Sequence, residues 1–143
     1  MEEIGVRLSI ISDNLTPFQM DEFVGIKCDE SQKRGDMNRL GTKHYERHAW
    51  FIKSKQTIRE DEYIGDKLDL AVAHLLSRLR GAEARIKELS GGNEVEFSLY
   101  LYAREVPPMG LSKAHLQTMA ALGASLDVDL ILYAESEEKT TIK

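Results

Sequence analysis

Hydrophobic and polar residues alternate along three segments of the chain, which span residues 4–12, 95–102 and 126–132. A period of two is typical of a β-strand that buries one face against the rest of the protein. We therefore predict three strands, and we expect the apolar side chains on one face to form the core with a layer of helices. These side chains are Ile4, Val6, Leu8, Ile10, Val95, Phe97, Leu99, Leu101, Leu126, Val128, Leu130 and Leu132.

Four other segments have the spacing and the end signals of helices. A short helix is predicted between Thr16, a residue type that caps helices, and Gly25, which suits the left-handed turn at a helix end. Leucines at steps of three and four predict the longest helix over residues 64–79. Two further helices are predicted over residues 82–89 and 112–122.

The segments between these elements are less regular. Residues 26–28 can begin a strand, and residues 49–53 carry the aromatic and β-branched side chains that strands favour. Between them, residues 29–48 are polar, contain two glycines and show no sustained period. This segment is predicted to be a long loop.

A strand, a capped helix, a glycine and a second strand occur in this order near both ends of the chain. Two such β-α-β units with a long central helix predict an α+β fold. We expect a two-layer sandwich of ferredoxin-like type, with an antiparallel sheet and helices on one face. Because 143 residues suit one domain, we predict a single domain over residues 1–134 and a polar C-terminal tail over residues 135–143.

Composition narrows the class of protein. Hydrophobic residues make up 42% of the chain and charged residues 30%, a mixture that disordered and collagen-like chains lack. No uncharged stretch approaches the roughly 20 residues of a membrane-spanning helix, and the acidic start has no apolar signal segment. We therefore expect a cytosolic protein without a membrane partner. Cys28 has no second cysteine for a disulfide or a zinc knuckle, and we expect no cofactor.

A set of short motifs runs through nearly the whole chain. The most specific is the run Gly-Ala-Ser-Leu-Asp-Val-Asp at residues 123–129. The others are Asp13, Leu15, Gly25, Arg34-Gly35-Asp36, Trp50, the leucine-rich helix over residues 68–79 and Leu111-Ser112. In these motifs the chain resembles the bacterial domain-of-unknown-function family numbered 4279, although Asp36-Met37 stands where that family has Glu-Pro. The resemblance implies a bacterial source and an intracellular single domain, and it brings no established activity, cofactor or catalytic residue.

The polar side of the three predicted strands is rich in tyrosines and acids. If the aliphatic side chains face the helices, the opposite side carries Arg7, Tyr100, Tyr102, Asp127, Asp129 and Tyr133. Tyrosine is common at recognition surfaces, because its ring packs while its hydroxyl still forms hydrogen bonds. This side of the sheet is therefore a candidate binding site. Two alternatives stay open, namely a solvated face with Arg7 paired to an acid across strands, and a face that pairs with a second copy in a homodimer.

Positive charge gathers in residues 33–55, which hold seven lysines and arginines and two acidic residues. Arg34 in this segment is a further candidate ligand for an anion. A basic segment can bind phosphate or nucleic acid, but the net charge of −5 and the pI near 5.4 argue against nucleic acid as a partner. The alternative is a solvated loop whose charge is balanced by nearby acids.

His44 and His48 are four residues apart, a spacing that can place two metal ligands on one face of a helix. The zinc-protease pattern needs a glutamate directly after the first histidine, whereas here the acid is Glu46. Because no third ligand is evident, we predict no metal site. We also find no catalytic residue, so the sequence favours a protein that is not an enzyme.

Two functional hypotheses follow. The first is a protein-interaction module that uses the tyrosine-rich face and the basic segment, with Asp127 and Asp129 as its strongest binding residues. One version of it is an immunity protein that neutralises a toxin domain, because an acidic protein is steered toward a cationic partner. The second is a small-molecule or anion-binding domain in which Arg7 and Arg34 hold a carboxylate or a phosphate.

Overall fold

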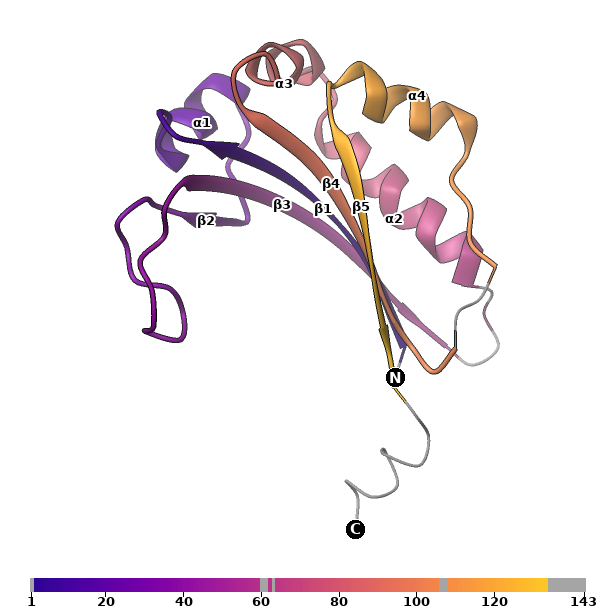
Figure 1. Ribbon diagram of the computed structural model, residues 1–143. Helices are drawn as coiled ribbons and strands as arrows, with labels where there is room; N and C mark the ends of the chain where they lie inside the picture. The colour runs from indigo at the N-terminus through magenta and orange to yellow at the C-terminus, as the bar shows by residue number, and fades with distance from the viewer. Residues whose placement is uncertain (1, 60–61, 63, 106–107, 134–143) are drawn as a thin grey trace.

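The computed structural model describes residues 2–59, 62, 64–105 and 108–133 (Figure 1). Within these residues the chain forms five strands and four helices. In chain order they are β1 (Glu2–Ser12), α1 (Pro17–Val24), β2 (Glu30–Gln32), β3 (His48–Ile58), α2 (Ile64–Arg78), α3 (Glu83–Leu89), β4 (Glu94–Ala103), α4 (Lys113–Ala121) and β5 (Ser125–Leu132). The predicted α+β class is confirmed.

The strands form one mixed sheet in the order β2-β3-β1-β4-β5. The central strand β1 is antiparallel to both neighbours, β3 and β4, and β2 is antiparallel to β3. β5 instead runs parallel to β4, so the prediction of a wholly antiparallel sheet is wrong. The physical reason is α4, which carries the chain back to the end of the sheet where β4 begins, and a crossover of this kind makes adjacent strands parallel.

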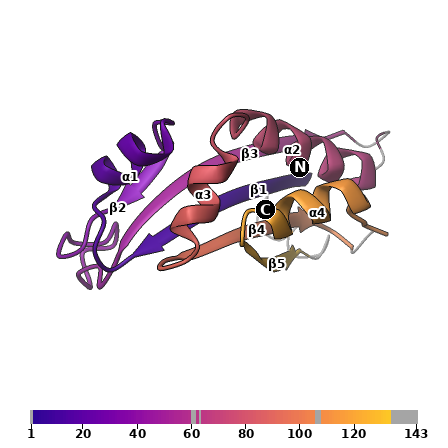
Figure 2. The ribbon, with the colours of Figure 1, turned by 90° about the horizontal axis from the view of Figure 1, so that it is seen from above.

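The core lies between β1, β3, β4 and the long helix α2, which packs against β1 and β3. On β1, Ile4, Val6, Leu8 and Ile10 are at most 1% exposed, and Ala71, Val72 and Leu75 of α2 are fully buried. The largest buried rings are Trp50 of β3 and Phe97 of β4. Figure 1 shows α1, α3 and α4 following one another along the top of the sheet, and Figure 2 shows α3 lying between the other two.

The ends of α1 follow from the predicted local signals. The hydroxyl of Thr16 accepts a hydrogen bond from Gln19 N at 3.2 Å, and Gln19 Oε1 accepts one from Thr16 N at 2.9 Å. This reciprocal pair satisfies two backbone donors that have no partner within the helix. Gly25 ends the helix with φ of 82°, a conformation that glycine adopts without steric cost.

The second strand lies further along the chain than predicted. Residues 26–28 are not a strand, because Cys28 N donates to Asp21 Oδ1 at 2.9 Å and so holds this segment against α1. β2 forms four residues after Ile26, as a short polar strand on the edge of β3. The segment that was predicted to be a loop over residues 29–48 therefore contains a strand, and β3 extends to Ile58.

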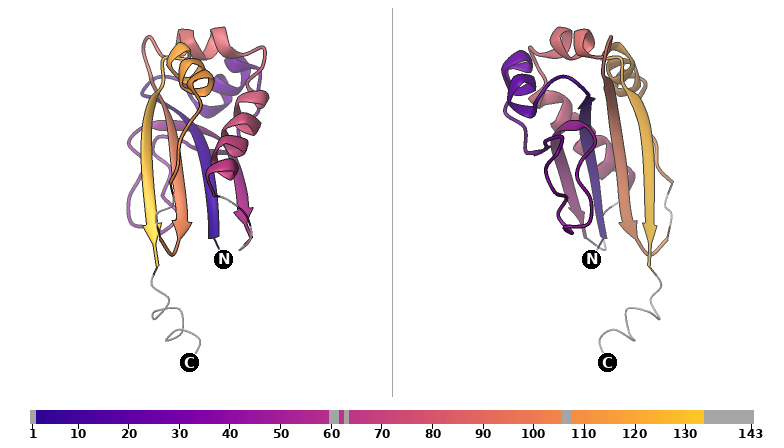
Figure 3. Two further views of the ribbon diagram at one scale, coloured as in Figure 1. Left: turned by 90° about the vertical axis from the view of Figure 1, so that its right-hand side faces the viewer. Right: turned by 60° about the vertical axis from the view of Figure 1, so that its left-hand side comes forward.

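The last strand differs most from the prediction. All eight residues of β5 are exposed, and its apolar side chains Leu126, Val128, Leu130 and Leu132 are 45%, 52%, 42% and 51% exposed. The expectation that these four residues form core is wrong. β5 is an edge strand (Figure 3), and no helix of the described residues buries its apolar side chains.

Two further predictions concern the ends of the chain and the membrane. The predicted C-terminal tail over residues 135–143 lies outside the described residues. Of the helices in the described part of the chain, none has the length and apolar character that a membrane span requires.

Candidate functional site

The candidate site lies on the side of the sheet that faces away from α2, which we name the open face. Two ladders of paired residues cross it. In one, Lys53 pairs with Arg7, Arg7 with Ser98, and Ser98 with Asp127. In the next, Lys55 pairs with Gly5, Gly5 with Tyr100, and Tyr100 with Asp129. Because residues two apart on a strand share a face, both ladders project to the same side.

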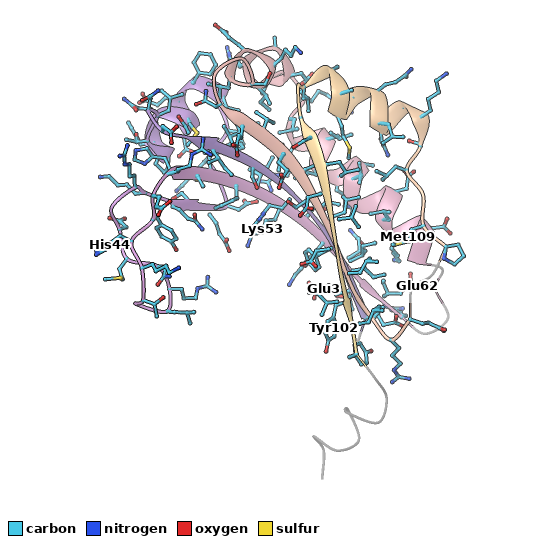
Figure 4. The ribbon with its side chains drawn as sticks, viewed as in Figure 1. Glu3, His44, Lys53, Glu62, Tyr102 and Met109 are labelled. Carbon is cyan, nitrogen blue, oxygen red and sulfur yellow. The ribbon has the colours of Figure 1, made fainter. Side chains whose placement is uncertain are left out.

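The side chains of these ladders surround a hollow of about 610 Å³. The residues that give the hollow its chemistry are Arg7, Lys53, Lys55, Tyr100, Asp127 and Asp129. Four of the seven predicted site residues therefore meet in one place. In Figure 4, Lys53 points away from the sheet on the side opposite Met109, which lies with the helices.

Charge is divided across the hollow. The cations come from β3 and β1, and the carboxylates come from β5. With neighbouring strands about 4.8 Å apart, the backbones of Arg7 and Asp127 are separated by about 10 Å, and those of Lys55 and Asp129 by about 14 Å. The two signs therefore face each other across a gap that a ligand or a partner side chain can fill.

Most of these charges have no ion-pair partner among the residues that the structure describes. Lys53 forms an ion pair with Glu30 of β2, and the guanidinium of Arg7 stacks over the Phe51 ring at 4.6 Å. Among the residues that the structure describes, Arg7, Lys55, Asp127 and Asp129 form no ion pair. The described residues thus contain no ion pair between Arg7 and an acid across strands.

Tyr100 forms part of the hollow's floor and is fixed in place. Its ring lies over Gly5, and its hydroxyl donates a hydrogen bond to Glu3 Oε1. Burial, helped by this bond and by the nearby negative charge of Glu3, raises the pKa of Tyr100 to about 12. The phenol is therefore neutral at physiological pH and serves as a hydrogen-bonding surface rather than as a base.

The other two predicted tyrosines lie beside the hollow. Tyr102 and Tyr133 stack with ring centroids 4.7 Å apart and planes 25° apart. The guanidinium of Arg104 lies 6.0 Å from the centroid of Tyr133. In Figure 4, Tyr102 is found next to Glu3 at the lower end of the sheet. The pair extends the open face with an aromatic surface but does not line the hollow.

Arg34 is in a different place. It belongs to the segment between β2 and β3, it does not line the hollow, and its backbone N–H donates to His48 Nδ1 at 3.0 Å. His44 Nδ1 lies 2.7 Å from Gly35 O in the same segment. The two histidines thus hold the backbone of this loop. In the described part of the chain, no group of three or more residues could hold a metal ion.

Cys28 has an environment that works against reactivity. Burial raises the pKa of its thiol, and a hydrogen bond to Asp21 and the charge of Asp21 add to the effect. The reactive form of a cysteine is the thiolate, which a raised pKa disfavours. Cys28 is half-buried and packs against the core.

A second hollow, of about 440 Å³, lies between the start of α2 and the turn before α4. Its residues include Asp66, Asp69 and Ser112. Beside it, His115 Nδ1 lies 2.8 Å from Asp69 Oδ1, and this contact ties α4 to α2. The hydroxyl of Ser112 accepts from His115 N and caps α4. These polar groups hold the helix in position.

Sequence reasoning missed Lys53 and Lys55 as site residues, and it missed the role of Gly5. The signal was present, because Trp50 and Ile52 predict a buried face on β3 and the alternation then places Lys53 and Lys55 on the other face. The alternation does not show which strand pairs with β3. Only the pairing with β1 brings the lysines beside Arg7.

The described residues form an α+β architecture with a mixed five-stranded sheet and a charged hollow on its open face, and these features define the class of the protein. The chain belongs to the family described as Domain of unknown function (DUF4279), whose model matches residues 2–133. The resemblance predicted from the sequence motifs is thereby confirmed. No curated protein and no solved structure matches the chain.

Proposed function

We propose that this protein is an interaction module that binds another protein through its open face. The observation that carries the proposal is a set of charges around one hollow that form no ion pair with any described residue, namely Arg7 and Lys55 on one wall and Asp127 and Asp129 on the other. Fixed charges of both signs favour one orientation of a partner and repel others, which gives specificity.

The aromatic groups support the same proposal. Tyr100 lies between the two charged walls, and the stacked pair of Tyr102 and Tyr133 continues the surface beyond the hollow. Tyrosine and arginine are enriched at the residues that dominate binding energy in protein interfaces. A partner side chain that enters the hollow would meet a ring, a hydroxyl and charges of both signs.

A finer version of the proposal is a cytosolic immunity protein from a bacterium, which neutralises a toxin domain. Two features support it. The family resemblance implies a bacterial source, and the whole chain has a net charge of −5, which steers it toward a cationic partner. In this version Asp127 and Asp129, which are exposed on the edge strand β5, contact the cationic partner.

A specific observation also favours a second function, the binding of a small anion. Arg7, Lys53 and Lys55 line one wall of the hollow, and its volume of about 610 Å³ falls in the range of ligand pockets. A carboxylate or a phosphate would find two cations that have no ion-pair partner among the described residues. Arg34 does not belong to this cluster.

We also infer that the fold is a ferredoxin-like unit extended by α4 and β5. The elements from β1 to β4 follow the β-α-β-β-α-β order if α3 is counted as part of the second crossover, and β3 lies between β1 and β2 in the sheet. We further infer that the helices form one layer on a single face of the sheet and that residues 1–134 form a single domain.

Affinity capture with matched variants tests the proposed function. The tagged protein is incubated with lysate of its native cell, beside Asp129→Lys and a control, Glu88→Lys, which makes the same charge change at an exposed position of α3. We expect one retained protein that the control keeps and Asp129→Lys loses, with melting temperatures unchanged. Equal capture by all three forms would contradict the assignment to the open face.

The anion-binding alternative predicts a different result. Inorganic phosphate should raise the melting temperature of the wild-type protein by mass action, and Lys55→Glu should abolish the rise. Lys87→Glu on α3 is the matched control and should leave it intact. If phosphate produces no rise in the wild-type protein, this alternative is wrong.

A further inference from the structure

β5 has an unusual combination of features for an edge strand. It is bonded on one flank to β4, and its other flank is the end of the sheet, where backbone donors and acceptors pair with no strand of the described residues. All eight of its residues are exposed. Proteins commonly protect such an edge with lysine, proline or a bulge, and Ser125–Leu132 contains no lysine and no proline.

The two sides of β5 differ in chemistry. On the side toward the helices, Leu126, Val128, Leu130 and Leu132 form an apolar row that is 42% to 52% exposed. On the open face, Asp127 and Asp129 stand at alternate positions and line the hollow. A strand that pairs with β5 therefore needs apolar side chains on one side and groups that tolerate two carboxylates on the other.

A second copy of the chain does not meet this need. Directly opposed residues in an antiparallel pair point to the same side of the sheet. The two registers that pair most of β5 with its own copy place either Asp127 against Asp129 or Asp129 against Asp129. Like charges directly opposite one another destabilise a strand pair. The carboxylates thus act against self-association at this edge.

We propose that β5 accepts a sixth strand from the partner, an extended segment in which apolar and basic residues alternate. Its lysines or arginines lie opposite Asp127 and Asp129 on the open face. Its apolar residues continue the row of Leu126, Val128 and Leu130 on the other side. Backbone hydrogen bonds to the free edge supply affinity, and the alternation supplies specificity. This inference rests on the proposed function, because it specifies the chemistry of the partner and how it reaches the hollow.

A synthetic peptide tests the inference directly. The probe is a fluorescently labelled peptide of sequence Thr-Val-Lys-Val-Lys-Val-Thr, and its matched control carries glutamate at both lysine positions. We expect the wild-type protein to bind the lysine peptide about tenfold more tightly than the glutamate peptide, since two favourable cross-strand pairs replace two repulsive ones. In the double variant Asp127→Lys and Asp129→Lys this preference should reverse. The exposure of both side chains makes the variant compatible with folding, which its melting temperature checks.

A second peptide separates strand addition from simple charge attraction. N-methylation at alternate residues of the lysine peptide removes backbone donors while it keeps every side chain. We expect binding to the wild-type protein to be lost. If the N-methylated peptide binds as well as the parent, the peptide occupies the hollow without adding a strand, which overturns the inference and leaves the proposed function in place. The inference is also wrong if the lysine peptide does not bind to the wild-type protein. It is likewise wrong if the wild-type protein is a dimer and the double variant changes its dimerisation, because a second copy of the chain then occupies the edge of β5.

Discussion

The ring of Tyr100 on β4 lies over Gly5, the residue directly paired with it on β1. A Cβ atom at Gly5 would overlap the ring, so the absence of a side chain on one strand makes room for the ring of the other. Gly5→Ala should therefore displace Tyr100 and lower the free energy of unfolding by about 1 to 3 kcal/mol, as other cases of overpacking do. Chemical denaturation measures this loss.

The double variant Gly5→Ala and Tyr100→Ala is the control for that measurement. Once the ring is gone, the added methyl group has room, so Gly5→Ala should cost much less in this background than in the wild-type protein. The same cost in both backgrounds would mean that the ring is not what excludes a side chain at Gly5.

The raised pKa of Tyr100 makes stability depend on alkaline pH. The folded protein holds the proton of Tyr100 up to about pH 12, whereas the unfolded chain releases it near the ordinary pKa of 10.0. The neutral phenol therefore stabilises the fold fully below pH 10, and this contribution is lost as the pH rises from 10 toward 12. We expect denaturation curves to show the loss in the wild-type protein and a smaller loss in Tyr100→Phe. Equal losses in both would contradict the assigned pKa.

The carboxylate of Asp21 accepts hydrogen bonds from two N–H groups that folding removes from water. Its Oδ1 accepts from the Nε1 of fully buried Trp50 at 2.7 Å and from Cys28 N at 2.9 Å. Asp21→Ala should leave the indole N–H without a partner and cost about 1 to 3 kcal/mol of unfolding free energy. Asp21→Asn keeps an acceptor oxygen and should cost less. The fluorescence of Trp50, the single tryptophan, follows unfolding in both variants, and equal costs would show that the acceptor does not matter.

Leu99 and Leu130 occupy paired strands but differ in burial. Leu99 is 6% exposed in the core, whereas Leu130 is 42% exposed on β5. Leu99→Ala should therefore cost about 2 to 5 kcal/mol, as large-to-small changes in a core do. Leu130→Ala should cost about 1 kcal/mol or less, because its side chain is already in contact with water. Thermal or chemical unfolding of the two variants measures the difference, and a larger loss at Leu130 would show that β5 is covered in solution.

Local signals predicted the elements well where several of them agreed. Thr16 and the left-handed Gly25 cap the two ends of α1 in the structure, as the sequence predicts. The period of two along β1 and β4 likewise identified the buried residues correctly, including Leu99. These features depend on residues close together in the chain.

Alternation does not reveal whether anything covers the apolar face of a strand. β5 has the same pattern as β1, yet β1 lies at the centre of the sheet beneath α2 and β5 lies at the edge. The difference is one of position, and position depends on contacts between distant segments. For the same reason the sequence predicted only part of the lining of the hollow. Lys53 and Lys55 line it because β3 pairs with β1.

The central place of β1 has a consequence for how the protein is made. β1 leaves the ribosome before both of its neighbours, because Glu3 pairs with Thr57 on one side and with Tyr102 on the other. The strand therefore has both neighbours only after the chain has been synthesised through β4, which ends at Ala103. Sheets built from such distant pairings fold slowly and pass through states with open edges. A nascent chain that has not yet reached β4 displays β1 with one flank unpaired, and such an edge is open to pairing with another chain.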